Sequence, residues 1–527
     1  MDKVSVIEDR RMVLQESRDA SRTRQDRNLL GQFATPKMLA ADILEYTRLL
    51  VPPTTTVRFL DPAFGTGSFY SALQCSFPAE RISAATGIEI DPHYGLPARE
   101  LWQGYPLELC ISDFTQASPP QPAEQYNLIV CNPPYVRHHH INIAEKRRLQ
   151  HATTKACGVH IGGLAGLYCY FIGLAHAWLA DDGIACWLIP SEFMDVNYGQ
   201  ALKTYLLDEV ELLRIHRFAP GDLQFTDALV SSAVVWFRKR CPSPNHIVEF
   251  TYGGSHARPT HTRTVPAAAL KLETKWTRFP VKDVRSDRTG PKLADFFRIQ
   301  RGLVTGDNKF FILTRDQIKM QNLPFEFFKP ILPGPRFVPM DEIETETDGT
   351  PRIERQLYVL DCKLSEVEIN RLYPNLATYL ETGKPAVSER YVCRYRSPWY
   401  SQEKRPPAPF ICTYMGRNLK KGRPIRFILN RSQATAANVY LMLYPKDFVA
   451  RVLESEQGLA RQVWSALNDI DLQSLLSEGR VYGGGLYKME PKELANVSAV
   501  SLVHLFPAHK FPEHENLQPS LWPTDEI

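Results

Sequence analysis

The stretch Asn127-Leu-Ile-Val-Cys-Asn-Pro-Pro-Tyr135 indicates both the fold and the place of a ligand site. Its apolar run is typical of a short strand that is covered on both faces of a sheet. Pro133 and Pro134 cannot donate to a strand ladder, and they disfavour helix in the residues before them. The strand therefore ends abruptly and leaves the Asn132 amide and the Tyr135 ring at its carboxyl end, where open α/β sheets bind ligands.

Three similar strand units precede this stretch. Val57–Asp61 is predicted as a strand, and the loop 62–69 after it holds two glycines that permit a tight turn and a close approach to a ligand. In the next strand, Glu89 occupies the position from which an acid takes ribose hydroxyls in dinucleotide-type folds. The third unit ends in Ile111-Ser-Asp-Phe114, which places an acid beside an aromatic ring.

The segment before the first strand is predicted to be helical. Thr35 as N-cap and Pro36 as first helical residue would start a helix over Lys37–Leu50. Such a helix N-terminus also suits a carboxylate. The first thirty residues are polar, and we interpret their basic cluster at 22–27 as a solvated helix face rather than as a phosphate clamp.

The chain after the opening stretch continues the alternation of strands and helices. Strands are predicted at residues 184–189, 212–217 and 228–237, and the uncharged segment 161–180 is predicted as a buried helix rather than a membrane span. This pattern indicates an α/β fold with a doubly wound, mostly parallel sheet of seven strands. The turn-rich segment at 241–244 marks a boundary. We therefore expect one domain over residues 1–245 and a second, mixed α+β domain over residues 246–527.

Composition narrows the class of protein. The chain has 527 residues, its net charge is +4, and residues 1–27 lack the apolar run of a secretory signal. Its 10 cysteines show no Cys-x-x-Cys pair, so a disulfide framework or a structural zinc site is not expected and a cytoplasmic location fits.

Charge is distributed unevenly between the two predicted domains. Residues 1–245 carry 23 Lys and Arg against 26 Asp and Glu, whereas residues 246–527 carry 39 against 32. The basic second half indicates an anionic partner, with candidate contact segments at 298–311, 390–396 and 420–426. Helices are predicted in this half near residues 445–454 and 458–467.

Four motifs together resemble the gamma-class, N6-adenine-specific DNA methyltransferases of type II restriction–modification systems. They are Gln32-Phe-Ala-Thr-Pro36, Leu60-Asp-Pro-Ala-Phe-Gly-Thr-Gly-Ser-Phe69, Asn132-Pro-Pro-Tyr135 and the segment from Phe225 to Val235. Their order and spacing match that family over roughly residues 30–240, although Phe64 stands where the family more often has cysteine. The strings 301–306 and 485–491 resemble parts of the family's target-recognition domain less specifically.

The resemblance implies a fold and a reaction. The fold would be a Rossmann-like S-adenosylmethionine-dependent methyltransferase domain followed by a DNA target-recognition domain. In the reaction, Asn132 and the carbonyl of Pro133, within the Asn-Pro-Pro-Tyr motif that includes Pro134, would hold the amine of an adenine. Tyr135 and Phe225 would stack on the faces of that base after it has flipped out of the duplex.

The resemblance also implies a cofactor pocket for S-adenosylmethionine and needs no metal. Thr35 would lie near the methionine carboxylate, Asp61 and Gly65 near the amino end, Glu89 at the ribose, and Asp113 and Phe114 at the adenine. The remaining cofactor-binding candidates are Ala63, Ile90 and Asn132. The expected partner is double-stranded DNA, a separate restriction endonuclease would act on the same sites, and the chain is expected to be a monomer.

Other functions remain open from the residues. A protein-glutamine or RNA methyltransferase shares the tetrapeptide, but the large basic second domain counts against both. A bifunctional endonuclease–methyltransferase would need a nuclease core that the thirty residues before the first motif cannot hold. An inactive methyltransferase fold serving as a DNA-binding specificity protein is opposed by the intact Asn-Pro-Pro-Tyr sequence.

Overall fold

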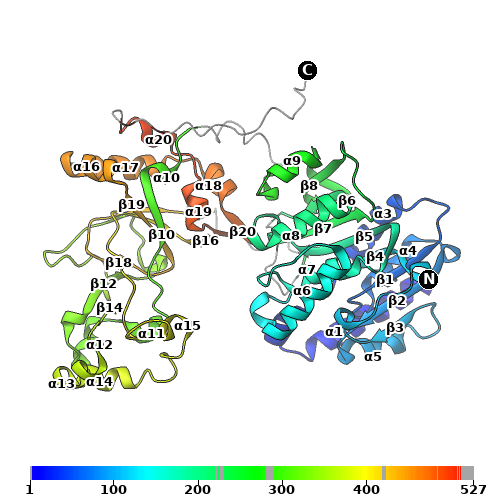
Figure 1. Cartoon of the computed structure of the whole chain (residues 1–527), viewed down its shortest axis with the longest axis horizontal. Coiled ribbons are helices and arrows are strands. Elements are labelled where there is room, and N and C mark those ends of the chain that lie inside the picture. The colour runs from blue at the N-terminus through cyan, green and yellow to red at the C-terminus, as the bar shows by residue number, and fades with distance from the viewer. Residues whose placement is uncertain are drawn as a thin grey trace. The chain divides into compact units, whose positions relative to one another are not determined.

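The computed structural model describes residues 3–219, 222, 224–225, 231–279, 290–417, 423–482, 485–506, 509 and 511. The chain divides into two compact units (Figure 1). The first comprises residues 1–283 with 482–484, and the second comprises residues 284–481 with 485–527.

The first unit is built on one nine-stranded sheet with the order β3-β2-β1-β4-β5-β7-β6-β8-β9. Its strands are β1 (Val57–Asp61), β2 (Ile82–Glu89), β3 (Glu108–Ile111), β4 (Tyr126–Cys131), β5 (Leu179–Pro190), β6 (Glu211–Arg217), β7 (Ser232–Arg238), β8 (Ile247–Ser255) and β9 (Arg258–Pro266). Strands β1 to β5 run parallel, and β7 lies antiparallel between β5 and β6. The predicted α/β class with a mostly parallel, doubly wound sheet is confirmed. Residues 228–230, predicted as the start of β7, lie outside the described residues.

Strands β8 and β9 correct the predicted strand number and the predicted boundary. The sheet has nine strands rather than seven, and the first unit extends to residue 283 rather than 245. Strand β8 pairs parallel with β6, and its Val248 and Phe250 are buried in the unit. The Pro-rich turn at 241–244 therefore connects two strands of one sheet. Such a turn looks the same in sequence whether it joins strands or domains.

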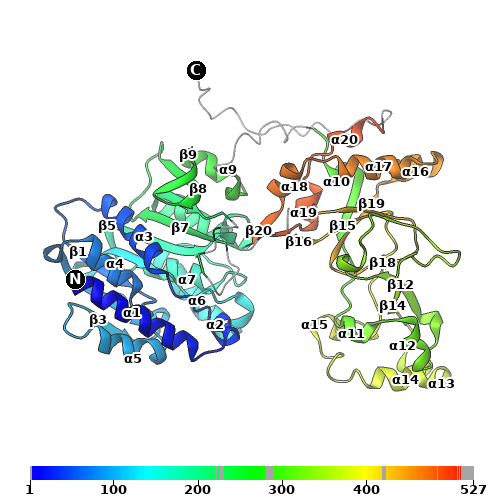
Figure 2. The ribbon, with the colours of Figure 1, turned by 180° about the vertical axis from the view of Figure 1, so that it is seen from behind.

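Helices cover both faces of this sheet. They are α1 (Lys3–Ala20), α2 (Arg24–Leu30), α3 (Lys37–Leu50), α4 (Ser68–Ser76), α5 (Pro92–Leu101), α6 (Ile143–Cys157), α7 (Leu167–Ala175), α8 (Gln200–Thr204) and α9 (Ala267–Leu272). Figure 1 shows α6 and α7 over one face, and Figure 2 shows α1 and α3 over the other. Helix α7 is largely buried and occupies part of the uncharged segment predicted as a buried helix. Among the described residues, no helix combines the length and apolarity needed to cross a membrane.

Helix α1 is more than the solvated helix that its polar sequence predicts. It packs against α4 and α5 and buries Ile7 together with an ion pair between Glu8 and Arg11. In the basic cluster that follows, Arg22 pairs with Asp91, so the interpretation of that cluster as a solvated face is wrong for Arg22. Its partner lies 69 residues away in sequence. A local charge pattern cannot reveal such a pairing.

The second unit has the mixed α+β character that was predicted. Its strands form a five-stranded sheet (β10-β19-β15-β17-β13), a four-stranded sheet (β11-β14-β12-β18) and a three-stranded sheet (β16-β21-β20). The strands are β10 (Phe297–Arg301), β11 (Ile312–Leu313), β12 (Phe328–Leu332), β13 (Glu342–Ile343), β14 (Leu357–Leu360), β15 (Phe410–Thr413), β16 (Met415–Arg417), β17 (Phe427–Asn430), β18 (Thr435–Ala436), β19 (Tyr440–Pro445), β20 (Arg480–Tyr482) and β21 (Leu486–Lys488).

Short helices connect these strands. They are α10 (Leu293–Phe296), α11 (Asn308–Phe311), α12 (Arg315–Met320), α13 (Glu366–Leu372), α14 (Pro374–Glu381), α15 (Tyr391–Arg394), α16 (Asp447–Ser455), α17 (Leu459–Asn468), α18 (Leu472–Glu478), α19 (Pro491–Ala495) and α20 (Val500–Val503). Helices α16 and α17 confirm the two helices predicted from apolar spacing. The first two candidate contact segments touch, because Arg390 donates to the Gly306 carbonyl at 3.1 Å. Residues 420–422 of the third segment lie outside the described part of the chain.

Candidate functional site

The candidate site lies at the carboxyl end of β4, in the middle of the nine-stranded sheet. The neighbours of β4 are β1 and β5, and strand order reverses direction between β1 and β4. Ligands of doubly wound sheets bind at such a switch point, because the loops on either side of it diverge and leave a crevice. Asn132 is the first residue after β4, so the sheet places its side chain at this crevice.

The Asn132 amide is held in one orientation by its own chain. Its Nδ2 donates to the Phe33 carbonyl at 2.9 Å and to Thr35 Oγ1 at 3.1 Å. Its Oδ1 is buried and has no hydrogen-bond partner among the described residues. A buried acceptor without a donor costs about 1–3 kcal/mol. The site therefore presents an acceptor that fits an N–H group of a ligand.

Thr35 serves this amide and does not cap a helix. Helix α3 begins at Lys37 with Pro36 at the N-cap position, and no side chain caps it. The predicted N-cap role of Thr35 is wrong, because its hydroxyl accepts from Asn132.

The segment Gly31–Thr35 lies directly against the loop that carries Asn132. The Tyr135 N–H donates to the Gly31 carbonyl at 3.0 Å. Gly31 has φ +66°, and a Cβ built on it would lie 2.4 Å from the Tyr135 nitrogen. Only glycine permits this approach.

Three aromatic rings gather beside the amide. The ring centroids of Phe33 and Tyr135 are 5.6 Å apart, those of Phe33 and Phe225 are 5.8 Å apart, and those of Tyr135 and Phe225 are 6.0 Å apart at 87°. Tyr135 also donates its hydroxyl to the Leu188 carbonyl at 3.1 Å. The structure thus brings together the two predicted stacking residues and adds Phe33, whose role the sequence did not reveal. Phe33 belongs to the motif Gln32-Phe-Ala-Thr-Pro36, and this position beside Gln32 and Thr35 was the sequence signal that could have indicated a role for it.

Two buried carboxylates lie at the ends of β1 and β2. Asp61 is 1% exposed and accepts from the Ala63 N–H at 3.1 Å, and burial raises the pKa of Asp61 to about 8. Glu89 accepts from the Gly65 N–H at 2.7 Å and the Asp91 N–H at 2.8 Å, and burial raises its pKa as well. Neither has an ion-pair partner among the residues that the structure describes. A cation and a pair of hydroxyl donors are the ligand groups that fit these acids.

The space beside these acids is open. Gly65 has φ +58°, and a Cβ built on it would meet no atom of the described residues within 4 Å. The Ile90 side chain next to Glu89 is 63% exposed, although isoleucine is usually buried. Predicted cofactor-binding residues therefore border a region that a ligand can occupy.

Asp113 and Phe114 already have structural contacts. Asp113 Oδ1 accepts from the Thr115 N–H at 2.9 Å, and Oδ2 accepts from the Gln116 amide at 2.8 Å. Phe114 is 3% exposed, and its ring packs against Phe171 and Trp178. Carboxylate oxygens can accept further hydrogen bonds. The cofactor roles of both residues stay predictions.

Comparison with known proteins identifies the family. Residues 101–225 match the model of the Eco57I restriction-modification methylase, and residues 270–518 match that of the C-terminal domain of type II methyltransferase M.Eco57I. The chain is a type II restriction–modification methyltransferase. As such it methylates DNA, and the modification has a protective role.

Relatives of this methyltransferase extend over most of its length. It is 28% identical to type II methyltransferase M.XamI of Xanthomonas campestris pv. amaranthicola, over 90% of this chain and 86% of that protein. It is 22% identical to type II methyltransferase M.AccI of Acinetobacter calcoaceticus, over 89% of this chain and 85% of that protein. The solved structure of the type IIL restriction-modification enzyme MmeI in complex with DNA matches with a TM-score of 0.55 and 14% identity, over 95% of this chain and 79% of MmeI.

Within the described ranges, no three His, Cys, Asp or Glu side chains are arranged to hold a metal ion. The three consecutive histidines at 138–140, just after the Asn-Pro-Pro-Tyr loop, form a single 3-10 turn.

Proposed function

We propose that this methyltransferase transfers a methyl group from S-adenosylmethionine to the N6 amine of an adenine in DNA. The observation that carries the proposal is the buried Oδ1 of Asn132, which has no hydrogen-bond partner among the described residues and lies beside a cluster of aromatic rings at the carboxyl end of β4. An acceptor at this place fits an exocyclic amine, and aromatic rings fit the faces of a base.

The amide would activate the amine by positioning it. The lone pair of the adenine N6 atom is delocalised into the ring, so the amine is a weak nucleophile. Asn132 Oδ1 and the carbonyl of Pro133 would each accept one of its hydrogens and direct the lone pair. This is catalysis by orientation and fixed dipoles, with no metal and no covalent enzyme intermediate. The hydrogen bonds from Asn132 to Phe33 and Thr35 keep the acceptor aimed.

The aromatic cluster would receive the flipped base after a rearrangement. A base between two parallel rings needs them about 7 Å apart, twice the contact distance of about 3.5 Å. The rings of Tyr135 and Phe225 are 6.0 Å apart and nearly perpendicular. They would have to part and turn as the base enters. Flipping costs roughly a few kcal/mol, and stacking returns about 1–3 kcal/mol for each base.

The two buried carboxylates fit the cofactor. S-adenosylmethionine supplies the methyl group from its sulfonium when bound. Asp61 would pair with its ammonium, and Glu89 would accept from its ribose hydroxyls. The open space at Gly65 and the exposed Ile90 leave room for it. Ala63 and Thr35 would complete the methionine end, and Asp113 and Phe114 the adenine end.

The division of the chain supports separate roles for the two units. The first would be the catalytic domain, because all the predicted site residues lie in it. The second, which matches the M.Eco57I C-terminal domain over most of its length, would recognise the DNA target sequence. We propose that the chain acts as a monomer on double-stranded DNA in the bacterial cytoplasm, with a restriction endonuclease acting as a separate protein. The solved complex of MmeI with DNA supports the DNA-binding part of this proposal.

The proposal that adenine is the methylated base is tested by identifying the methylated nucleoside. DNA from cells that express this chain alone should be digested to nucleosides and also sequenced with detection of modified bases. We expect N6-methyladenine at one short recurring sequence. N4-methylcytosine would overturn the choice of base. Unmodified DNA together with methylated protein or RNA would favour the alternative substrates, and no methylation at all would favour an inactive specificity protein.

The stacking role of Phe225 predicts a selective loss of base capture. We expect Phe225→Ala to weaken capture of the flipped base by about 5- to 150-fold, which corresponds to the loss of one stack of about 1–3 kcal/mol. Cofactor affinity should change little. The measurement is the fluorescence of 2-aminopurine at the target position, with Phe225→Tyr as a control that keeps an aromatic ring. Equal fluorescence in wild type and Phe225→Ala would contradict the stacking role.

A further inference from the structure

We propose that Arg22 is a positioning residue that ties the cofactor side of the site to the catalytic side. This inference rests on the proposed function, in which Glu89 binds the cofactor and Asn132 binds the base. It adds a residue outside the family motifs, two residues after the end of helix α1.

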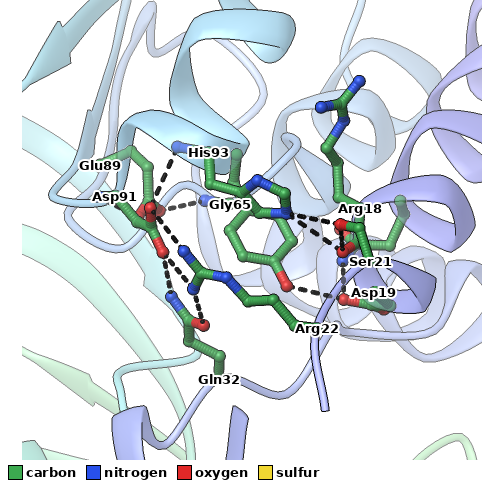
Figure 3. Close-up of polar contacts among 11 residues, drawn as sticks. Arg18, Asp19, Ser21, Arg22, Gln32, Gly65, Glu89, Asp91 and His93 are labelled. Carbon is green, nitrogen blue, oxygen red and sulfur yellow. Dashed lines mark hydrogen bonds and ion pairs between the residues drawn. The ribbon is translucent and has the colours of Figure 1, made fainter. Parts of the chain in front are cut away.

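The guanidinium of Arg22 lies between two acceptors (Figure 3). It contacts both Asp91 oxygens, at 2.5 and 3.2 Å, and donates to Gln32 Oε1 at 2.9 Å. Gln32 Nε2 in turn donates to Asp91 Oδ2 at 2.8 Å. The three side chains thus form a closed triangle. Burial alone would raise the pKa of Asp91, but hydrogen bonds from Gln32 and Arg22 outweigh it and hold the pKa below its usual value.

The Asp91 side of the triangle reaches the cofactor carboxylate. The Asp91 N–H donates to Glu89 Oε1 at 2.8 Å, while the Gly65 N–H donates to Glu89 Oε2 at 2.7 Å. The Asp91 side chain also accepts from the His93 N–H at 3.0 Å and so caps helix α5. The Asp91 N–H therefore fixes the position of Glu89 Oε1, and the ion pair with Arg22 fixes the position of Asp91.

The Gln32 side of the triangle reaches the catalytic amide. Phe33 is the next residue, its carbonyl accepts from Asn132, and its ring packs on Tyr135 and Phe225. Thr35, three residues after Gln32, is the other acceptor of the Asn132 amide. A displacement of about 1 Å at a reacting group can cost about 100-fold in rate. The position of Gln32 therefore affects the orientation of the Asn132 amide.

Helix α1 gives Arg22 a fixed base. Arg11 donates to Thr66 Oγ1 in the glycine loop at 3.1 Å, and Tyr94 of α5 donates to Asp19 at 2.9 Å. The His93 ring lies 3.1 Å from the Arg18 carbonyl. Helix α1 is thus braced at several points along its length before the chain reaches Arg22. Because helix α1 is held in place, Arg22 can keep Asp91 and Gln32 at a fixed distance from each other. An arginine on a mobile terminus could not do so.

The test compares Arg22→Ala and Arg22→Lys with Arg10→Ala, which removes an exposed arginine from helix α1. We expect Arg22→Ala to lower kcat by about 10- to 100-fold and to raise KM for S-adenosylmethionine, with DNA affinity unchanged. Arg22→Lys should recover only part of the loss, because an ammonium cannot bridge two acceptors as the planar guanidinium does. Wild-type kcat and KM in Arg22→Ala, measured well below its Tm, would overturn the proposal.

Two further variants separate the sides of the triangle. Asp91→Asn keeps a helix cap and the N–H to Glu89 but removes the charge that pairs with Arg22. Because Asp91 is then held less firmly beside Glu89, we expect a rise in cofactor Kd with a nearly unchanged kcat. Gln32→Leu should lower kcat with the cofactor Kd unchanged. Equal effects of both variants on both constants would overturn the separation and with it the positioning role.

One readout is independent of the reaction. In the cofactor-free protein, hydrogen exchange of the segment 31–36 should be faster in Arg22→Ala than in Arg10→Ala. Unchanged exchange would overturn the role of Arg22 even if the enzyme is confirmed as an adenine methyltransferase. Faster exchange in a protein that methylates no adenine would keep the role of Arg22 in holding this segment and reject the proposed function instead.

Discussion

Asn132→Ala is expected to lower the rate of methyl transfer by at least about 10³-fold, with cofactor affinity close to that of the wild type. A single positioned hydrogen-bonding group at a reacting centre is worth about 10²–10³ in rate. The substitution also removes the bonds that join the loop after β4 to Phe33 and Thr35. The measurement is single-turnover methyl transfer to DNA, together with calorimetric binding of S-adenosylmethionine.

Asn127→Ala is the matched control, because Asn127 lies near the other end of the same strand. Its amide donates to the Thr56 carbonyl at 2.7 Å and accepts from the Arg58 N–H at 2.9 Å, so it joins β4 to β1. This variant should lose stability and keep its rate at temperatures well below its Tm. If Asn132→Ala turned over at a near-normal rate, the assignment of the catalytic amide would fail.

Asp61→Asn is expected to weaken S-adenosylmethionine binding by about 10- to 100-fold, because a hydrogen bond to a charged group contributes about 1.5–3 kcal/mol. The raised pKa of Asp61, about 8, predicts a second signature. The carboxyl is mostly protonated at neutral pH without ligand, so binding an ammonium group should release a proton. Calorimetry in buffers of different ionisation enthalpy measures that release, and Asp61→Asn should abolish it.

The same residue predicts how stability depends on pH. The folded-state pKa of Asp61 lies above the ordinary value of 3.8 for an aspartate, so the group favours the folded state fully at low pH, and this contribution declines as pH rises from about 4 to about 8. The Tm of cofactor-free Asp61→Asn relative to wild type should therefore rise over this range. Asp181→Asn, at a 92% exposed side chain, is the control and should show no such trend. A falling relative Tm would contradict the burial of a protonated Asp61.

The sequence by itself determined the elements that depend on local chemistry. An apolar run stopped by Pro133 and Pro134 makes a central strand with Asn132 at its carboxyl end, and β4 has that position. Residues at helical spacing predicted α16 and α17, and helix α3 covers the predicted Lys37–Leu50. Strand propensity, turn residues and apolar periodicity are properties of neighbouring residues, so they can be read without the fold.

Only the tertiary structure decided which side chains meet. Phe33 and Thr35 hold the Asn132 amide across 99 and 97 residues, and Arg22 reaches Asp91 across 69. Strands β8 and β9 join the first unit because β8 pairs with β6, although a Pro-rich turn precedes them. These contacts follow from the packing of the sheet and its helices, and no local pattern encodes a partner that far along the chain. The same packing buries Asn132 Oδ1 with no donor from the part of the chain that the structure describes, and this free acceptor is the observation that supports a binding site at the tetrapeptide.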